Sequence, residues 1–370
     1  MKKNTSIDFV NLDWVLIILT LICTAFGILV ISSAVNTMSG SSKFIIIQSG
    51  AAVIGLIAMA VFAAIDYEDL GALAKVIYGL CIASLLMVFV LGTGLESTGS
   101  KSWIRFGPIG IQPSEFVKIG FIITFSMHVS KYGDEINRPA NVIKLIIHAA
   151  VLIVLILMQP DYGTALVFIC IMAGILFAAG ISWKYVLGAG AVSATVLPII
   201  WFFFLNTARK NRILVFLSPE SDPSGAGYHV LQSKLTIGSG QIFGKGLFHG
   251  TQTQLGYLPV KHTDFIFGVI GEELGLIGCL AVIALLFGLI FRILYNSRNS
   301  KNDFGTYICV GVAFMLIAHV FENIGMCIGL MPVTGIPLPF FSYGGSSLLT
   351  NFIAMGLVLS VYMRRKVINF

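Results

Sequence analysis

The chain has 370 residues, of which 57% are hydrophobic and only 11% are charged, with a formal net charge of +6. A soluble protein carries about 25% charged residues, so this composition excludes a string of soluble domains and indicates one polytopic membrane domain. The basic residues are scattered along the sequence, which argues against a nucleic-acid-binding surface.

Ten apolar stretches approach or exceed the length of about 20 residues that a helix needs to cross a bilayer. The predicted spans are 14–35, 44–65, 70–91, 114–129, 142–158, 164–179, 183–205, 265–294, 306–330 and 341–363. The first lacks a small-residue cleavage site, so we expect a retained helix rather than a removed signal peptide. The predicted fold is all-α, with residues 1–370 forming a single transmembrane domain.

The basic residues also predict the orientation in the membrane. An even number of spans places both termini on one side, and Lys and Arg accumulate on the cytoplasmic side. The side that holds the termini carries Lys2, Lys3, Lys75, Lys131, Arg138, Lys144, Lys184, Arg292, Arg298, Lys301, Arg364, Arg365 and Lys366. The opposite short loops carry only Lys43, Lys101 and Arg105. Both termini are therefore predicted to be cytoplasmic.

Two outer loops are prominent. Residues 92–113 are rich in Gly and Ser. Residues 206–263, between the seventh and eighth predicted spans, form a large extracytoplasmic loop that carries Arg209, Arg212 and Lys234. Because long ordered loops are usually functional, we expect this loop to contribute to a site.

Three carboxylates stand at the head of the eighth span, in the run from His262 to Gly275. They are Asp264, Glu272 and Glu273. Charge at membrane depth is costly and usually functional. Helical geometry directs Asp264, and less strongly Glu272, toward the inside of the bundle, whereas Glu273 points the opposite way and needs another partner.

Asp264 is the strongest candidate for a catalytic base. It lies beside His262 where the long loop becomes a helix, within reach of solvent. The alternative is a helix cap, since the helix dipole favours a carboxylate there. At about 100° per residue, Gly268, Gly271 and Gly275 share its face. Such a stripe predicts either a close helix contact or a groove for a lipid chain.

Other charges in apolar surroundings also need a reason. Glu115 and Lys118 are three residues apart, so they can pair on one helix face, either to staple the helix end or to line an outward-facing cavity. Asp161 lies in a tight turn, where Asp commonly bonds the backbone. A catalytic role for Asp161 is the alternative.

A second polar group and the cysteines are expected to be structural. His319, Glu322 and Asn323 share one face of the ninth span and are predicted to satisfy one another. The six cysteines all lie in apolar segments. Disulfides and structural zinc are therefore not expected.

Several long motifs extend over nearly the whole chain. They include Gln112-Pro-Ser-Glu-Phe-Val-Lys118, Gln159-Pro-Asp161, Gly271-Glu-Glu-Leu-Gly275 and Gly335-Ile-Pro-Leu-Pro-Phe-Phe-Ser-Tyr-Gly-Gly-Ser346. With these motifs the chain resembles the shape, elongation, division and sporulation (SEDS) family. Residues 227–234 and 247–254 resemble its elongation members more than its division members.

The resemblance implies a ten-helix peptidoglycan glycosyltransferase of the bacterial cytoplasmic membrane. Such enzymes polymerise lipid II into glycan strands on the outer membrane face. They work among membrane lipids with a class B penicillin-binding protein, which supplies the transpeptidase, and with the elongation machinery. Nucleic acid is not an expected partner.

The resemblance also implies roles for individual residues. Asp264 matches the essential aspartate of the family, and Glu115, Lys118 and Asp161 match residues of its central cavity. The chain departs from the family pattern at Val260, where an acid is frequent, and at Glu322, where a neutral residue is usual.

A mechanism follows as a hypothesis. Asp264 takes the proton from the acceptor sugar, undecaprenyl diphosphate leaves, and the anomeric configuration inverts. Lys118, Arg209, Arg212 or a divalent cation (Mg or Mn) stabilises the diphosphate.

The remaining predictions concern the surroundings of the base. Lys234, His262 and Glu272 are expected to line the substrate cavity, and the glycine stripe is expected to hold prenyl tails. Two alternative functions are a lipid II flippase and a non-catalytic scaffold for the penicillin-binding protein.

Overall fold

The computed structural model describes residues 12–94, 100–106, 109–199 and 225–365, with isolated positions between 202 and 222. Its helices are α1 Trp14–Val35, α2 Ser41–Ala64, α3 Tyr67–Ala72, α4 Ala74–Leu91, α6 Pro113–Ser130, α7 Pro139–Met158, α8 Tyr162–Ala178, α9 Trp183–Ile199, α11 Ala226–Ser239, α12 Thr251–Gln254, α13 Ile266–Arg298, α14 Asp303–Ile328 and α15 Gly345–Met363. A 3₁₀ turn covers Gly133–Asn137, and strands β1 (Ile104–Phe106) and β2 (Ile109–Ile111) pair antiparallel.

Seven of the described helices are long and apolar enough to cross a membrane. They are α1, α2, α4, α7, α13, α14 and α15. The predicted boundaries of α1 are confirmed to the residue. The predicted span 70–91 is wrong in its first turn, because α3 ends at Ala72 and α4 begins only after Leu73. The last helix begins at Gly345, later than predicted, because residues 335–344 form a non-helical segment.

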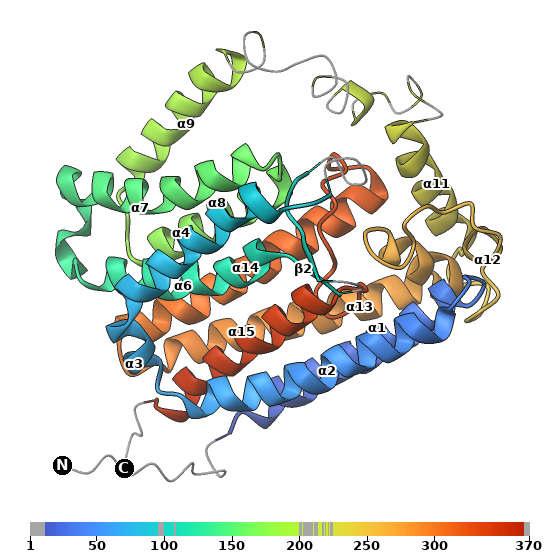
Figure 1. The fold of residues 1–370 in the computed structure, drawn as a ribbon, viewed down its shortest axis with the longest axis horizontal. Helices are drawn as coiled ribbons and strands as arrows, with labels where there is room; N and C mark the ends of the chain where they lie inside the picture. The colour runs from blue at the N-terminus through green and yellow to red at the C-terminus, as the bar shows by residue number, and fades with distance from the viewer. Residues whose placement is uncertain are drawn as a thin grey trace.

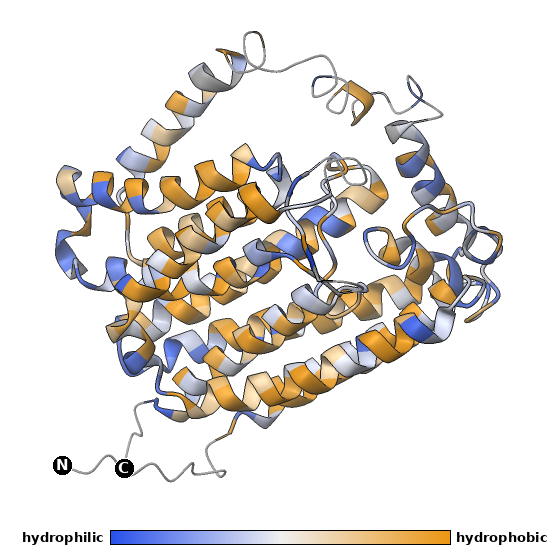
Figure 2. Cartoon of the chain, viewed as in Figure 1, coloured by the Kyte–Doolittle hydropathy of each residue, from blue (hydrophilic) through white to orange (hydrophobic). Residues whose placement is uncertain are grey.

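The helices pack as a bundle around α14. This helix contacts α6, α8 and α13, while α15 packs along α2 and α1 packs on α13 (Figure 1). Apolar residues cover the bundle helices, and hydrophilic residues gather at their ends and in the turns (Figure 2). Helix α9 runs away from the bundle in Figure 1.

The start of α1 meets the ends of α13 and α15 at one end of the bundle. The Asp13 carboxylate caps α1 by accepting from the amide of Leu16 (3.2 Å). It also accepts from Arg292 Nε (2.8 Å) and Asn296 Nδ2 (2.6 Å) on α13. The Arg292 guanidinium in turn lies 5.8 Å from the ring centroid of Tyr362 on α15. These contacts connect the start of α1 with α13 and, through Arg292, with the end of α15.

Helix α13 is broken at Gly275, whose φ of 67° and ψ of −162° are non-helical. The loop 241–246 restores the hydrogen bonds that the break removes. Amides of this loop donate to the carbonyls of Glu272 (3.0 Å) and Glu273 (2.9 Å), and its carbonyls accept from the two amides after the break, at 2.9 and 3.2 Å. A break at this depth is tolerated because protein, rather than lipid, satisfies the freed backbone groups.

Candidate active site

Asp264 lies directly before α13, in a position that the neighbouring helix α14 fixes. The α13 N-cap is Phe265 and no side chain caps it, so the predicted capping role of Asp264 is wrong. The Asp264 backbone carbonyl accepts from Asn323 Nδ2 (2.8 Å) and Cys327 Sγ (3.6 Å). Asn323 Nδ2 also donates to the carbonyl of Ile336 (2.8 Å). The backbone of Asp264 is therefore anchored while its carboxylate stays out of the helix cap.

The segment 335–344 holds the residues before Asp264. The Ser342 hydroxyl donates to the carbonyl of Thr263 (2.6 Å), and the Tyr343 amide donates to the carbonyl of His262 (2.8 Å). A Cβ placed on Gly335 would lie 3.6 Å from Asp264 Oδ2, so the carboxylate faces this segment.

The environment of Asp264 changes its acidity. The side chain is partly buried, and burial raises the pKa of its carboxyl to about 6, with a hydrogen bond from Thr263 opposing the shift. A carboxylate with this pKa is ionised at neutral pH and is a better proton acceptor than an ordinary aspartate. The geometry therefore suits a general base.

The predicted pair of Glu115 and Lys118 is confirmed. Lys118 Nζ lies 2.8 Å from Glu115 Oε1, and the two side chains are only 1% and 3% exposed. Lys118 Nζ also lies 2.8 Å from His319 Nε2 on α14. The other His319 nitrogen lies 2.7 Å from the carbonyl of Met315, where it must donate. The Nε2 atom therefore accepts from Lys118, which leaves His319 neutral.

Asp161 is the N-cap of α8, as the turn interpretation predicts. Its Oδ1 atom accepts from the amide of Thr164 (3.2 Å), and its Oδ2 atom accepts from Gln112 Nε2 (3.2 Å). Burial raises the pKa of Asp161, with the bond from the Thr164 amide and the charge of Lys118 opposing the shift.

Residues 334–336 contact the start of α8 and also lie beside the Asp264 carboxylate. A Cβ on Gly163 would contact Thr334 and Ile336 at 2.7–3.0 Å. Gly335, between these two residues, is the neighbour of the Asp264 carboxylate. Segment 334–336 thus connects the Asp161 end of α8 with Asp264.

Glu272 has a structural position that differs from its predicted one in the substrate cavity. Its fully buried carboxylate accepts from the amides of Gln252 and Thr253, both at 2.8 Å, and pairs with Lys245 Nζ at 2.8 Å. Glu272 therefore clamps the N-terminus of α12, where a carboxylate is favoured by unpaired amides. Glu273 accepts from Ser33 Oγ (2.6 Å) on α1, which supplies the separate partner that it was predicted to need.

The glycine stripe of α13 is a packing face, so its predicted use as a prenyl groove is wrong. A Cβ on Gly271 would lie 3.0–3.1 Å from Ile237 of α11, and one on Gly268 would lie 3.1 Å from Leu258. A Cβ on Gly275 would collide with backbone of the loop 241–246. The glycines are needed because backbone and side chains from the large loop fill the space against α13.

The predicted mutual satisfaction of His319, Glu322 and Asn323 is also wrong. His319 bonds Lys118, and Asn323 bonds the carbonyls of Asp264 and Ile336. Glu322 is 1% exposed, and neither of its carboxylate oxygens has a hydrogen-bond partner among the described residues.

The remaining predicted site residues are basic. Lys234 on α11 is exposed and lies beside Gly329, the C-cap of α14. Arg209 and Arg212 lie outside the described residues.

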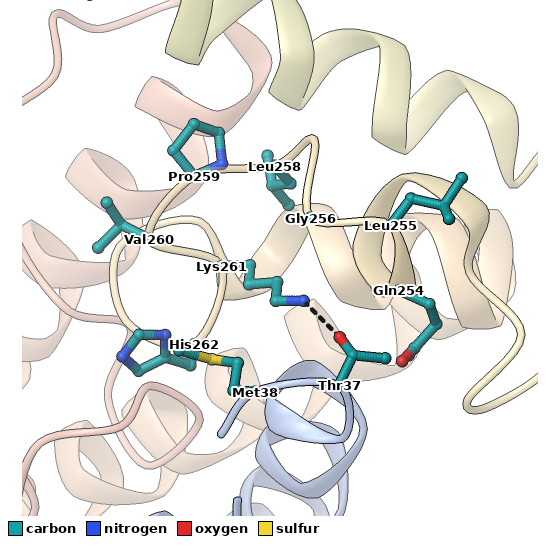
Figure 3. A pocket seen from close by; sticks show the side chains of 10 residues that line it. All are labelled: Thr37, Met38, Gln254, Leu255, Gly256, Leu258, Pro259, Val260, Lys261 and His262. Carbon is teal, nitrogen blue, oxygen red and sulfur yellow. Dashed lines mark hydrogen bonds between the residues drawn. The ribbon is translucent and has the colours of Figure 1, made fainter. Parts of the chain in front are cut away.

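An open pocket of about 390 Å³ adjoins His262, on the side of the loop near the end of α1 (Figure 3). Its lining residues are Thr37, Met38, Gln254, Leu255, Gly256, Leu258, Pro259, Val260, Lys261 and His262. Lys261 Nζ approaches Thr37 Oγ1 at 3.5 Å and bonds the carbonyl of Thr253, so it fastens the loop to α1. Burial, followed by the charge of Lys261, lowers the pKa of His262. His262 is therefore neutral at pH 7.

A divalent cation has few protein ligands available here. Within the described part of the chain, no three His, Cys, Asp or Glu side chains are placed to hold a metal ion. Mg²⁺ commonly uses one or two carboxylates and takes its other ligands from phosphates and water. The donor set fits a cation that arrives with a diphosphate better than a resident one.

The family model FTSW_RODA_SPOVE, described as a cell cycle protein, matches residues 13–367. The chain belongs to this family. The match covers the anchored aspartate, the buried Lys118 network and the broken helix α13 together, so these features lie within one family domain.

Named relatives are similar over nearly their whole length. The chain is 38% identical to the peptidoglycan glycosyltransferase MrdB of Escherichia coli K12, covering 100% of this chain and 98% of the relative. It is 35% identical to the probable peptidoglycan glycosyltransferase FtsW of Trichlorobacter lovleyi, covering 94% and 92%.

Solved structures share the fold. A chain of a peptidoglycan synthase complex that coordinates polymerization and crosslinking matches with a TM-score of 0.81 at 29% identity, covering 95% of this chain and 97% of that one. The rod shape determining protein RodA of Thermus thermophilus matches with a TM-score of 0.73 at 26% identity, covering 97% and 99%.

Proposed function

We propose that this chain is a peptidoglycan glycosyltransferase that polymerises lipid II during cell elongation. The main support is the environment of Asp264. Its backbone is held by α14 and by segment 335–344, and its carboxyl has a pKa of about 6. Relatives named as peptidoglycan glycosyltransferases support the assignment of the reaction.

In the proposed reaction, Asp264 accepts the proton of the sugar hydroxyl of an incoming lipid II. The freed oxygen attacks the anomeric carbon of the nascent glycan strand. The bond from that carbon to undecaprenyl diphosphate breaks, and the configuration inverts. One base suffices because diphosphate is already a good leaving group.

The diphosphate needs positive charge beside it. Lys118 is a buried cation shared between Glu115 and His319, and Lys234 is exposed on α11. Arg209 and Arg212 of the large loop are further candidates. A divalent cation, Mg or Mn, would supply additional charge stabilisation when bound with the diphosphate.

We propose ten membrane spans, with α6, α8 and a helix that includes α9 joining the seven described above. Both termini are cytoplasmic in this arrangement, as the Lys and Arg distribution favours. Asp264 and the large loop at 206–263 then face the outside, where lipid II is presented.

We further propose a class B penicillin-binding protein as the partner. The similar chain in the peptidoglycan synthase complex supports this choice, because in that assembly polymerisation is coordinated with crosslinking. The elongation machinery and the surrounding membrane lipid are further proposed partners.

The test is polymerisation by the purified full-length protein in lipid nanodiscs, given labelled lipid II, with and without the partner and Mg²⁺ or Mn²⁺. Glycan strands are expected from the wild type and not from Asp264→Asn. Transport of lipid II without polymer would support a flippase instead. Partner binding without either activity would support a scaffold.

A further inference from the structure

Glu322 is a buried acid on α14 that the mechanism above does not use. It lies on α14, one residue before Asn323, which anchors Asp264, and three residues after His319, which bonds Lys118. It is therefore placed between the base and the buried cation.

Within the described part of the chain, no basic side chain forms an ion pair with Glu322. Lys118 is already bonded to Glu115 and His319. Asp161, the next acid in its field, adds a like charge. The hydroxyl of Thr334 lies beside Glu322, outside the geometry of a full hydrogen bond.

An ionised carboxylate in such a position is strongly unfavourable. Burying an isolated charge in an apolar medium costs far more than protonating it, so the group takes up a proton instead. A neutral carboxylic acid offers one O–H donor and one acceptor oxygen. Both carboxyl oxygens of Glu322 lack a partner in the described ranges, as does Oδ1 of the adjacent Asn323.

Unpaired polar atoms are rare in protein interiors, so a group of them marks a place that favours a polar binding partner. Five such atoms belong to α8, α14 and segment 334–336: Thr164 Oγ1, Glu322 Oε1, Glu322 Oε2, Asn323 Oδ1 and Thr334 Oγ1. A ligand that bridges Lys118 and a neutral acid must be rich in negatively charged oxygen atoms.

We propose that Glu322 is a protonated acid whose O–H donates to a phosphate oxygen of the prenyl diphosphate, on the side of the site away from the Asp264 carboxylate. The assignment rests on the proposed function, since it places the leaving group. Asp264 then accepts a proton on one side while Glu322 binds the departing diphosphate on the other. No proton leaves Glu322, so the balance of the transfer is unchanged.

The experiment separates this role from catalysis by measuring binding in an Asp264→Asn background. Undecaprenyl diphosphate is titrated onto the full chain in nanodiscs without Mg²⁺. Adding Glu322→Leu is expected to weaken binding about 10- to 100-fold, the range for a hydrogen bond to a charged group. Adding Glu322→Gln, which keeps a donor, is expected to weaken it less than tenfold. Phe321→Leu, on the exposed side of the same helix turn, is the matched control and should change nothing.

Infrared difference spectra supply a second readout. The carbonyl stretch of a protonated carboxylic acid should be present at pH 7 and should vanish in Glu322→Gln. An ionised Glu322 would overturn the proposal, as would wild-type affinity in Glu322→Leu. If Glu322→Leu does not fold, the spectrum and the Gln variant decide. Equal loss in both variants, with binding dependent on Mg²⁺, would make Glu322 a cation ligand and also refute it. Because none of these readouts requires polymer, failure of the proposed activity would be seen separately.

Discussion

Replacing Asp264 with Asn should abolish polymerisation while making the folded protein more stable. The folded-state pKa of about 6 lies above the ordinary aspartate value of 3.8, because burial penalises the charged form. The carboxyl therefore stabilises the fold below pH 3.8, and this contribution is lost as the pH rises through 6. At pH 7.5 the ionised group opposes folding.

The magnitude follows from the shift. A difference of about two pKa units corresponds to about 3 kcal/mol, and the partial exposure of Asp264 reduces this to about 2 kcal/mol. Asn is neutral at every pH, so Asp264→Asn should gain about 2 kcal/mol of stability at pH 7.5 and little near pH 4. Loss of the base should lower the rate by about 10²- to 10⁴-fold.

The assay compares thermal unfolding of the wild type and the variant in nanodiscs at both pH values, beside lipid II polymerisation. Asp134→Asn, at an exposed turn, is the control and should alter neither. A variant that is destabilised at pH 7.5, or that polymerises at the wild-type rate, would show that Asp264 is not a destabilising buried base.

Three further outcomes are expected. Polymerisation by the wild type should rise with pH through about 6 and then level, because Asp264 must be ionised to accept a proton; a rate that is flat between pH 5 and 7.5 would contradict this. Glu272→Gln should destabilise the protein by about 2 kcal/mol, since it removes the buried charge that accepts from the α12 amides and pairs with the partly exposed Lys245, and limited proteolysis should then cut near 241–254; resistance equal to the wild type would contradict the clamp. Asn323→Leu should lower kcat about tenfold, with KM little changed, by releasing the carbonyl of Asp264; a change in KM alone would argue against positioning.

Much of the site could be found from the sequence because its signals are local. The spacing of Glu115 and Lys118 predicts their pairing, and the turn before α8 predicts the capping role of Asp161. The position of Asp264 at a loop-to-helix junction marks it as reachable from solvent.

Other contacts could not be read from spacing. Asn323 lies 59 residues from Asp264 and nonetheless holds its backbone. Ser342 supports Thr263 across a similar separation. The motif at 335–346 includes Ser342, but it does not specify which atoms of distant residues meet.

By itself, the sequence determined a membrane-embedded helical bundle, its boundaries to within a few residues at most helices, and the acid best suited to be a base. Composition and local geometry carry that information. Only the tertiary structure decided what Glu272, Glu322 and the glycine stripe do. Whether a buried carboxylate has hydrogen-bond partners depends on which residues, distant in sequence, pack against it. A row of glycines forms a groove only if no other part of the chain packs into it. In this fold Ile237, Leu258 and the loop 241–246 fill that space, and the amides of α12 bond Glu272, whereas Glu322 is left without a partner among the described residues.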